Sequence, residues 1–273
     1  MNPGAPPSSP LIPSWFRRTF PALAERLETF GRNDDLAFLA RHFGTDKWGA
    51  HFYTPHYETH FRPFRRRPVR LLEIGAGGYE SPTQGGNSLR MWKRYFPRGR
   101  IYAVDLYDKS ALEEPRIRIF RGSQVDPQLW ERVFAEAPEF DLIVDDGSHR
   151  SDHIPETFRL LFPRLKTGGI YAVEDTQTSY WPVYGGDSLN LDNPPTQMNF
   201  FKRLADGLNY PEFLQGRQPR ATPWDAQIAS LHFYHNLVFI YKGPNDEPSN
   251  KFEEPTNRTW LPTASALRAN RRA

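Results

Sequence analysis

The sequence predicts a doubly wound α/β fold with short N-terminal helices and a late antiparallel strand. Short apolar runs that end in Gly or acidic residues recur after Pro68, and stretches long enough for crossover helices separate them. This alternation favours a parallel sheet covered on both faces. At 273 residues, with 38% hydrophobic content, the chain can bury one substantial core but hardly two.

Two short helices are expected before the sheet. Apolar residues recur at helical spacing over residues 21–30 and 34–43. Asn33 or Asp34 is the expected cap of the second helix, because either side chain can accept a hydrogen bond from a backbone N–H of the first turn.

Strands are expected where apolar runs are short and end at turn residues. The expected parallel strands span residues 69–74, 101–104, 117–120, 141–144 and 170–173. The helices that connect them are expected at residues 88–95, 127–135 and 154–165. The aromatic and β-branched stretch after residue 228 has no crossover helix, so an antiparallel strand is expected at 237–241.

One main domain with attachments follows from this pattern. Residues 1–13 are Pro-rich and are predicted to be a disordered tail, and residues 14–67 are predicted to be a helical segment. The main domain is expected over residues 68–245, with an inserted substrate loop at 176–227 and a tail at 246–273.

The composition excludes several kinds of protein. The chain has no Cys, which excludes disulfides, thiolate metal sites and Cys nucleophiles. No run approaches the ~20 apolar residues of a membrane span, so a cytoplasmic enzyme is expected. A net charge of +3, from 35 basic and 32 acidic residues, is too even to require nucleic acid as a partner. The basic cluster between Arg62 and Arg70 is interpreted as a solvated linker, with an anionic partner as the alternative.

A Gly-rich turn follows the first expected strand. Glycines let the backbone approach a ligand closely, so this turn is expected beside a nucleotide-like cofactor. Asp105 ends the second strand, where its carboxylate can accept the hydroxyl hydrogens of a ribose. A dinucleotide stays open as the alternative on these features alone. The expected cofactor-binding residues are Glu73, Gly75, Gly77, Asp105, Ser123, Gln124 and Asp145.

Acidic residues end the fourth and fifth expected strands. The fourth strand delivers Asp145 and Asp146, and the fifth delivers Glu174 and Asp175. Ligands bind at the carboxyl ends of the strands in such a sheet, so both tips are expected to face one site. Asp146, Glu174 and Asp175 offer hard oxygen ligands for Mg²⁺, Ca²⁺ or Mn²⁺. Asp145 is not expected to join them, because adjacent residues at a strand end point opposite ways.

His149 follows Asp146 by three residues, across a Gly-Ser turn. An imidazole ordinarily titrates near pH ~6.5 and can accept a proton at neutral pH, so His149 is the expected general base. Zinc binding by His56 and His60 is disfavoured, because Tyr57 stands where the zinc protease pattern needs Glu.

These motifs together resemble the metal-dependent sugar O-methyltransferases of the macrolide type. The resemblance rests on residues 44–47, 53–57, 72–75, 145–149, 173–178 and 232–236. It implies a Rossmann-like class I methyltransferase sheet, S-adenosyl-L-methionine as cofactor and Mg²⁺ or Mn²⁺ as the metal. It also implies that Asp146, Glu174 and Asp175 hold this metal and that His149 is the base. Similar catalytic domains methylate mannose-containing polysaccharides in mycobacteria.

The predicted function is methyl transfer to a sugar hydroxyl of a glycosylated natural product or of a mycobacterial-type methylmannose polysaccharide. The expected partner is a sugar-containing small molecule or oligosaccharide, and a homo-oligomer stays open. Tyr180, Trp181 and His235 are the expected substrate contacts. The alternatives are a metal-dependent hydroxylase, whose iron would need two His and one carboxylate, and a non-catalytic nucleotide-binding module.

Overall fold

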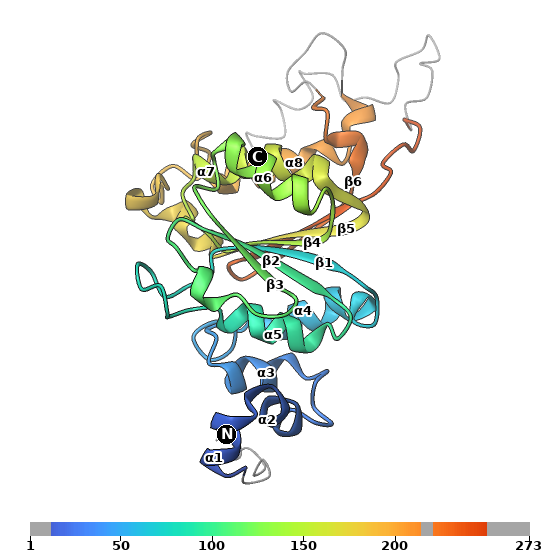
Figure 1. Ribbon diagram of the computed structural model, residues 1–273. Coiled ribbons are helices and arrows are strands. Elements are labelled where there is room, and N and C mark those ends of the chain that lie inside the picture. Colours follow the sequence, from blue (N-terminus) through green and yellow to red (C-terminus); the bar gives the residue numbers. More distant parts are fainter. Residues whose placement is uncertain (1–11, 214–220, 250–273) are drawn as a thin grey trace, which may run out of the picture.

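A seven-stranded mixed sheet organises the described part of the chain (Figure 1). The computed structural model describes residues 12–213 and 221–249. Its strands are β1 (Arg70–Ile74), β2 (Arg100–Asp105), β3 (Ile117–Arg121), β4 (Phe140–Asp145), β5 (Leu165–Glu174), β6 (Ile228–Tyr234) and β7 (Leu237–Lys242). Its α-helices are α1 (Ser14–Thr19), α2 (Pro21–Glu28), α3 (Leu36–Phe43), α4 (Thr54–Phe61), α5 (Asn87–Tyr95), α6 (Pro127–Glu136), α7 (His153–Leu161) and α8 (Gln197–Gly207).

The strand order in the sheet is β3-β2-β1-β4-β5-β7-β6, with β7 antiparallel to both of its neighbours. β1 pairs with both β2 and β4, so the strand order reverses at β1. In open α/β sheets, ligands bind outside the carboxyl ends of the strands at such a switch point. The register aligns Ile74 with Asp145, and Asp145 with Val173. The residues that follow β1, β4 and β5 therefore emerge together at one edge of the sheet.

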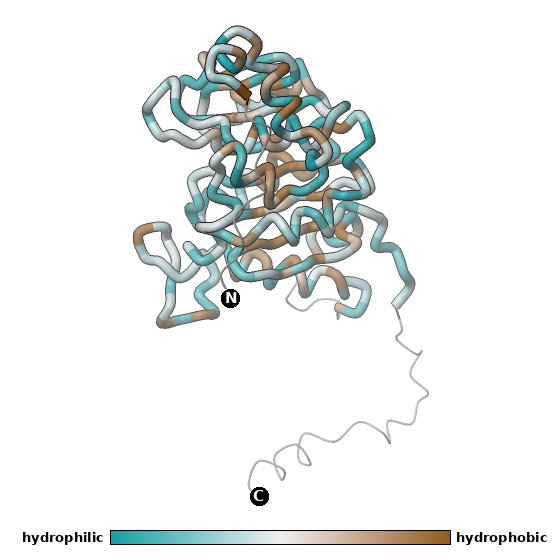
Figure 2. Tube along the Cα trace, turned by 90° about the horizontal axis from the view of Figure 1, so that it is seen from below, coloured by the Kyte–Doolittle hydropathy of each residue, from teal (hydrophilic) through white to brown (hydrophobic). Residues whose placement is uncertain are grey.

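Each face of the sheet carries one hydrophobic layer. Figure 1 shows α3, α4 and α5 on one side of the sheet and α6, α7 and α8 on the other. Alternate residues of β4 divide between the layers, because Leu142 and Val144 pack in the first and Ile143 in the second. Burial of both faces explains why these strands read as continuous apolar runs. In Figure 2 the hydrophobic segments run mainly through the middle of the trace.

The predicted α/β sheet with late antiparallel strands is confirmed. The five parallel strands and the three crossover helices lie where the sequence places them, although β5 begins earlier than expected, at Leu165. The antiparallel strand predicted at 237–241 is β7, and a second one, β6, precedes it. Most side chains of β6 are only partly buried, so this strand lacks the apolar run that marks the others.

The prediction that Asn33 or Asp34 caps a helix is wrong, because Asp35 is the cap of α3. The Asp35 carboxylate accepts a hydrogen bond from the backbone N–H of Phe38 at 2.7 Å. The helix begins at Leu36, whose side chain is fully buried, so packing of this residue sets the position of the cap.

Three predicted segments lie partly outside the described residues. These parts are residues 1–11 of the N-terminal tail, residues 214–220 of the inserted loop and residues 250–273 of the C-terminal tail. The described part of the inserted loop contains α8 and several short 3₁₀ turns. Within residues 12–213 and 221–249, no helix has the length and apolar content that a membrane span requires.

Candidate active site

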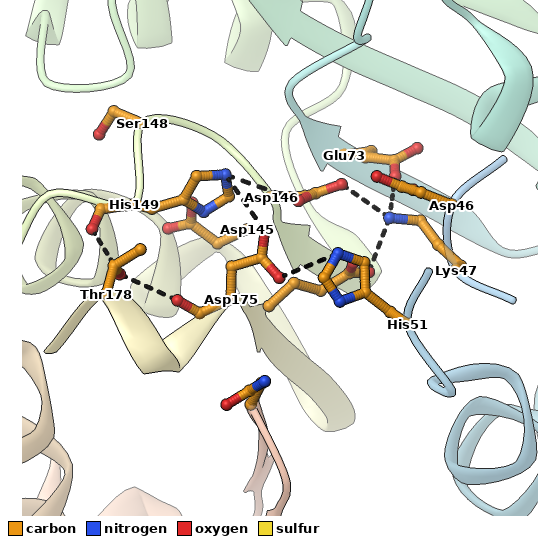
Figure 3. Close-up of polar contacts among 12 residues, drawn as sticks. Asp46, Lys47, His51, Glu73, Asp145, Asp146, Ser148, His149, Asp175 and Thr178 are labelled. Atoms are coloured by element: carbon orange, nitrogen blue, oxygen red, sulfur yellow. Dashed lines mark hydrogen bonds and ion pairs between the residues drawn. The ribbon is translucent and has the colours of Figure 1, made fainter. Parts of the chain in front are cut away.

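Two carboxylates and one imidazole converge where β4 and β5 end (Figure 3). Asp146 follows β4 directly, and Asp175 follows β5. The Nε2 atom of His149 lies 3.9 Å from Oδ1 of Asp146 and 3.7 Å from Oδ2 of Asp175. The three potential ligand atoms all lie within 4.8 Å of one another, and each side chain is partly exposed. The two carboxylate oxygens suit a hard divalent cation, and the imidazole nitrogen lies beside them.

Asp145 points away from this cluster, as the alternation along a strand requires. Its carboxylate is fully buried and accepts hydrogen bonds from the Tyr171 hydroxyl at 3.0 Å and from Nε2 of Gln124 at 3.4 Å. Burial raises the pKa of Asp145 to about 7. Asp145 therefore does not line the cofactor-sized cavity described below, although the sequence predicts it as a cofactor contact.

The backbone of His149 is held in an unusual conformation. Its φ angle is +55°, in the left-handed region that residues other than glycine rarely adopt. Its carbonyl oxygen accepts hydrogen bonds from Oγ1 of Thr178 at 2.8 Å and from Nε2 of Gln197 at 3.4 Å. The Gln197 amide also donates to Oγ1 of Thr178 at 2.5 Å. These contacts fix the direction in which the imidazole leaves the turn.

A fully buried lysine lies beside the cluster (Figure 3). The Nζ atom of Lys47 lies 2.7 Å from Asp146 Oδ2, 2.8 Å from Glu174 Oε1 and 3.3 Å from Glu73 Oε1. Burial by itself lowers the pKa of the lysine, but the carboxylates of Asp146, Glu174 and Glu73 outweigh burial and raise it well above the ordinary value. Lys47 is therefore a permanent cation within this group of acids.

The segment that follows Lys47 supplies hydroxyl donors to Glu174 and Asp175, the two acids at the end of β5. The Tyr53 hydroxyl donates to Oδ1 of Asp175 at 2.7 Å, and the Tyr57 hydroxyl donates to Oε1 of Glu174 at 2.6 Å. His51 stacks on Tyr53, and its Nε2 lies 3.7 Å from Asp175 Oδ1. Although burial opposes its charge, the hydrogen bond from Tyr53 and the nearby histidines lower the pKa of Asp175.

Glu174 and Glu73 lie on the Lys47 side of the site. Glu174 is almost fully buried, and the oxygen that contacts Lys47 also accepts the Tyr57 hydrogen bond. Glu73 accepts a hydrogen bond from Oγ of Ser88 at 3.0 Å, and burial raises its pKa to about 7. The metal role of Glu174 and the cofactor role of Glu73 stay predictions, because the first lies outside the three-residue cluster and the second outside the cavity.

A cavity of about 480 Å³ opens beside the cluster. Its volume lies in the range of small-molecule sites, roughly 300 to 1,000 Å³. Gly75 has a φ of +92°, and a Cβ there would stand 2.2 Å from the carbonyl oxygen of Asp146, so only glycine fits this turn. The Asp105 carboxylate accepts backbone N–H bonds from Ala76 at 2.8 Å and Tyr107 at 2.9 Å. The predicted residues that line the cavity are Gly75, Gly77, Asp105, Ser123, Gln124, Asp146, His149 and Asp175.

The three predicted substrate contacts lie outside the lining of this cavity. Tyr180 and Trp181 are 38% and 49% exposed and belong to the segment after β5. His235 is exposed at the turn between β6 and β7. Its neighbour Asn236 reaches the site, because the Asn236 carbonyl accepts the Tyr53 hydroxyl at 3.3 Å.

Several residues of the site carry no role in the sequence prediction. Lys47, Tyr53 and Tyr57 lie in the motif segments 44–47 and 53–57, which is the only signal that marks them. They act across long sequence separations, 99 residues between Lys47 and Asp146, which no local spacing reveals. His60, in the same region, has its two ring nitrogens 2.6 and 2.9 Å from the hydroxyls of Tyr241 and Tyr234, which supports the prediction against zinc.

The strand order and the cavity at the switch point define a Rossmann-like methyltransferase fold. No protein-family model matches the sequence. The chain is 47% identical over 228 residues to 8-demethyl-8-alpha-L-rhamnosyl tetracenomycin-C 2'-O-methyltransferase of Streptomyces olivaceus, covering 83% of this chain and 60% of that protein. It is 42% identical over 234 residues to mycinamicin VI 2''-O-methyltransferase of Micromonospora griseorubida, covering 85% of this chain and 56% of that protein.

A solved structure extends the comparison. The MycE methyltransferase of the mycinamycin biosynthetic pathway, in complex with Mg, SAH and mycinamycin VI, is 37% identical with a TM-score of 0.76. The match covers 95% of this chain and 68% of that one. The chain belongs to this family of sugar O-methyltransferases. It spans about 60% of the length of the curated relatives or less.

Proposed function

We propose that this chain is an S-adenosyl-L-methionine- and Mg²⁺-dependent O-methyltransferase that acts on a sugar hydroxyl of a glycosylated natural product. The observation that carries the proposal is the cluster of Asp146, His149 and Asp175 at the wall of a cofactor-sized cavity. The family relatives support the substrate class, because their names describe methylation of glycosylated tetracenomycin and mycinamicin compounds.

The cavity suits S-adenosyl-L-methionine. Gly75 and Gly77 let the backbone approach the ligand, and Asp105 presents its carboxylate where β2 ends. Ser123 and Gln124 add polar groups to the same wall. A related structure is solved with SAH, the demethylated form of this cofactor.

The acidic cluster suits Mg²⁺ or Mn²⁺. Asp146 and Asp175 would hold the ion through oxygens that face His149, with Glu174 as the further predicted ligand. When bound, the metal would polarise the acceptor hydroxyl and lower its pKa. An iron oxygenase is disfavoured, because the cluster in the described residues offers one His and two carboxylates instead of two His and one carboxylate.

His149 is the proposed general base. Its Nε2 atom lies 3.9 Å from Asp146 and 3.7 Å from Asp175, so it can take the proton from an acceptor hydroxyl held beside the cluster. The negative charge of Asp146 and Asp175 stabilises the imidazolium that forms. The hydroxyl oxygen then forms a bond to the methyl carbon while the carbon–sulfur bond of S-adenosyl-L-methionine breaks, which leaves the neutral thioether.

The acceptor and the cellular setting follow from the family relatives. The named substrates are glycosylated small molecules, which favours a natural product over a mycobacterial-type polysaccharide. A cytoplasmic location, the absence of a nucleic-acid partner and a homo-oligomeric state stay predictions from the sequence.

The test is mass spectrometry of acceptors after incubation with enzyme, Mg²⁺ and cofactor that carries a deuterated methyl group. The panel should pair rhamnosylated and other glycosylated polyketides with their aglycones and with mannose polysaccharides. We expect the labelled methyl group on glycosylated small molecules and not on their aglycones or on the polysaccharides. Labelling should be lost when EDTA is added and in the Asp146→Asn variant. Asp192→Asn is the matched control, because this aspartate is exposed and its carboxylate pairs with Lys202, on the surface of the described residues. Labelling of the aglycone, or full labelling in EDTA, would contradict the proposal.

A further inference from the structure

We infer that Lys47 is a positioning residue that sets the geometry of the metal site. The inference rests on the proposed function, since it concerns the carboxylates that would hold the metal. Lys47 is fully buried, so water does not solvate its ammonium group. Its partners are all side-chain carboxylates, those of Asp146, Glu174 and Glu73.

Asp146 is held on both sides. Oδ2 contacts Nζ of Lys47 at 2.7 Å, while Oδ1 faces His149 Nε2 at 3.9 Å. Because one oxygen is fixed by the ammonium, the other is directed toward the open side of the cluster. Without Lys47 the same carboxylate could rotate or turn away, and the cluster would lose its fixed ligand direction.

Glu174 is tied to the same ammonium. Its Oε1 lies 2.8 Å from Lys47 Nζ and accepts the Tyr57 hydroxyl at 2.6 Å. Lys47 thereby joins the end of β4 to the end of β5. It fixes the distance between the carboxylates of Asp146 and Glu174, two of the predicted metal ligands. It also offsets part of the repulsion between these acids, which crowded carboxylates otherwise relieve by taking up protons or cations.

The chain around Lys47 is itself fixed. Gly44 ends α3 with a φ of 71°, which turns the chain toward the site. The carbonyl of Lys47 then accepts backbone N–H bonds from Tyr53 at 3.1 Å and Thr54 at 3.3 Å. This closed turn places Lys47, Tyr53 and Tyr57 on three different carboxylates. The segment before the sheet therefore acts as one side of the metal site.

The structure makes two opposing effects measurable. Removal of a positive charge would by itself strengthen the attraction for Mg²⁺, whereas loss of the fixed carboxylate would weaken binding. Partners of metal ligands typically contribute about 10- to 100-fold to metal affinity. We expect positioning to dominate, so that Lys47→Met raises the Kd for Mn²⁺ by about 10- to 100-fold.

The experiment measures Mn²⁺ binding by electron paramagnetic resonance and S-adenosyl-L-methionine binding by calorimetry. Lys242→Met is the matched control, because Lys242 is a buried lysine that donates to the carbonyl of Phe162 at 2.8 Å, away from the acids. We expect the control to keep the wild-type Mn²⁺ affinity. Lys47→Met should lose Mn²⁺ affinity while its cofactor affinity changes less than about threefold, a split that general loss of structure would not produce.

The outcomes separate the two proposals. Unchanged or tighter Mn²⁺ binding by Lys47→Met would overturn the positioning role. The proposed function would stand in that case, provided that the wild-type protein binds Mn²⁺. Wild-type protein that binds no Mn²⁺ contradicts the metal-dependent function instead. If Lys47→Met fails to fold, Lys47→Gln gives the decision by the same criteria, since it keeps a polar end and removes the charge.

Discussion

Asp145 and Asp146 are the same residue type in adjacent positions, yet their surroundings give them different chemistry. Asp145 is buried among uncharged donors, and burial raises its pKa to about 7. Asp146 is partly exposed and contacts a buried ammonium. The alternation of side chains along a strand explains this difference, and the sequence predicted that the two side chains point opposite ways.

His149 is the residue on which the proton transfer depends. We expect His149→Ala to lower turnover by about 10²- to 10⁴-fold, the usual contribution of a positioned base. Binding of Mn²⁺ and S-adenosyl-L-methionine should change only a few-fold, because the carboxylates and the cavity remain. Steady-state kinetics at saturating Mg²⁺, with calorimetry of both ligands, measures this. Near wild-type turnover would remove His149 from the mechanism, and a large loss of metal affinity would make it a ligand instead.

The sequence predicted residues at strand ends better than the residues that support them. The apolar runs of β4 and β5 are visible in the sequence, and Asp146, Asp175 and His149 follow them. Residues at the carboxyl ends of such strands are expected to line the ligand site. Lys47 and Tyr53 act on these residues from a segment before the first strand. The position of Lys47 and Tyr53 depends on how α3 and α4 pack against the sheet. The hydrophobic pattern around these two residues does not reveal that packing.

At the level of elements, α8 fixes the base through its first residue. The sequence predicts residues 176–227 as an inserted substrate loop. In the structure Gln197 begins α8 and is fully buried against Thr178 and the carbonyl of His149. A helix outside the main alternation thus holds the backbone of a site residue.

This contact predicts a selective loss in Gln197→Leu. Removal of the amide takes a donor from the buried Thr178 hydroxyl, which costs about 1 to 3 kcal/mol, while the His149 carbonyl keeps its hydrogen bond from Thr178. We expect turnover to fall by roughly 5- to 100-fold, with cofactor affinity nearly unchanged. Lys202→Gln, on the exposed part of the same helix, should match wild type. Equal losses of turnover and cofactor affinity would show that Gln197 supports the fold in general.

At the scale of the whole molecule, the site joins distant parts of the chain. Lys47, Tyr53 and Tyr57 reach the ends of β4 and β5 because α4 packs on the sheet beside β7. His60 lies at this junction, with its ring nitrogens 2.6 and 2.9 Å from the hydroxyls of Tyr241 and Tyr234. The rings around His60 are those of His232, Phe239 and the two tyrosines. Loss of this junction would therefore loosen both the fold and the site.

The protonation of His60 makes this junction sensitive to pH. Burial, together with His232 and His56, lowers the pKa of His60 from 6.5 to about 4. Between these values the unfolded chain binds a proton that the folded chain excludes, so the stability conferred by neutral His60 is lost as the pH falls.

We expect His60→Gln, which keeps polar contacts but does not titrate, to show a weaker dependence of Tm on pH than wild type. Other titrating groups are common to both proteins and largely cancel in the comparison. A contribution of about 1 kcal/mol corresponds to roughly 2–4 °C in a domain of this size. The Tm decrease from about pH 7.5 to about pH 5 should therefore be smaller in the variant by this amount, as measured by scanning calorimetry. Equal decreases in the two proteins would show that His60 takes up its proton without cost to the fold.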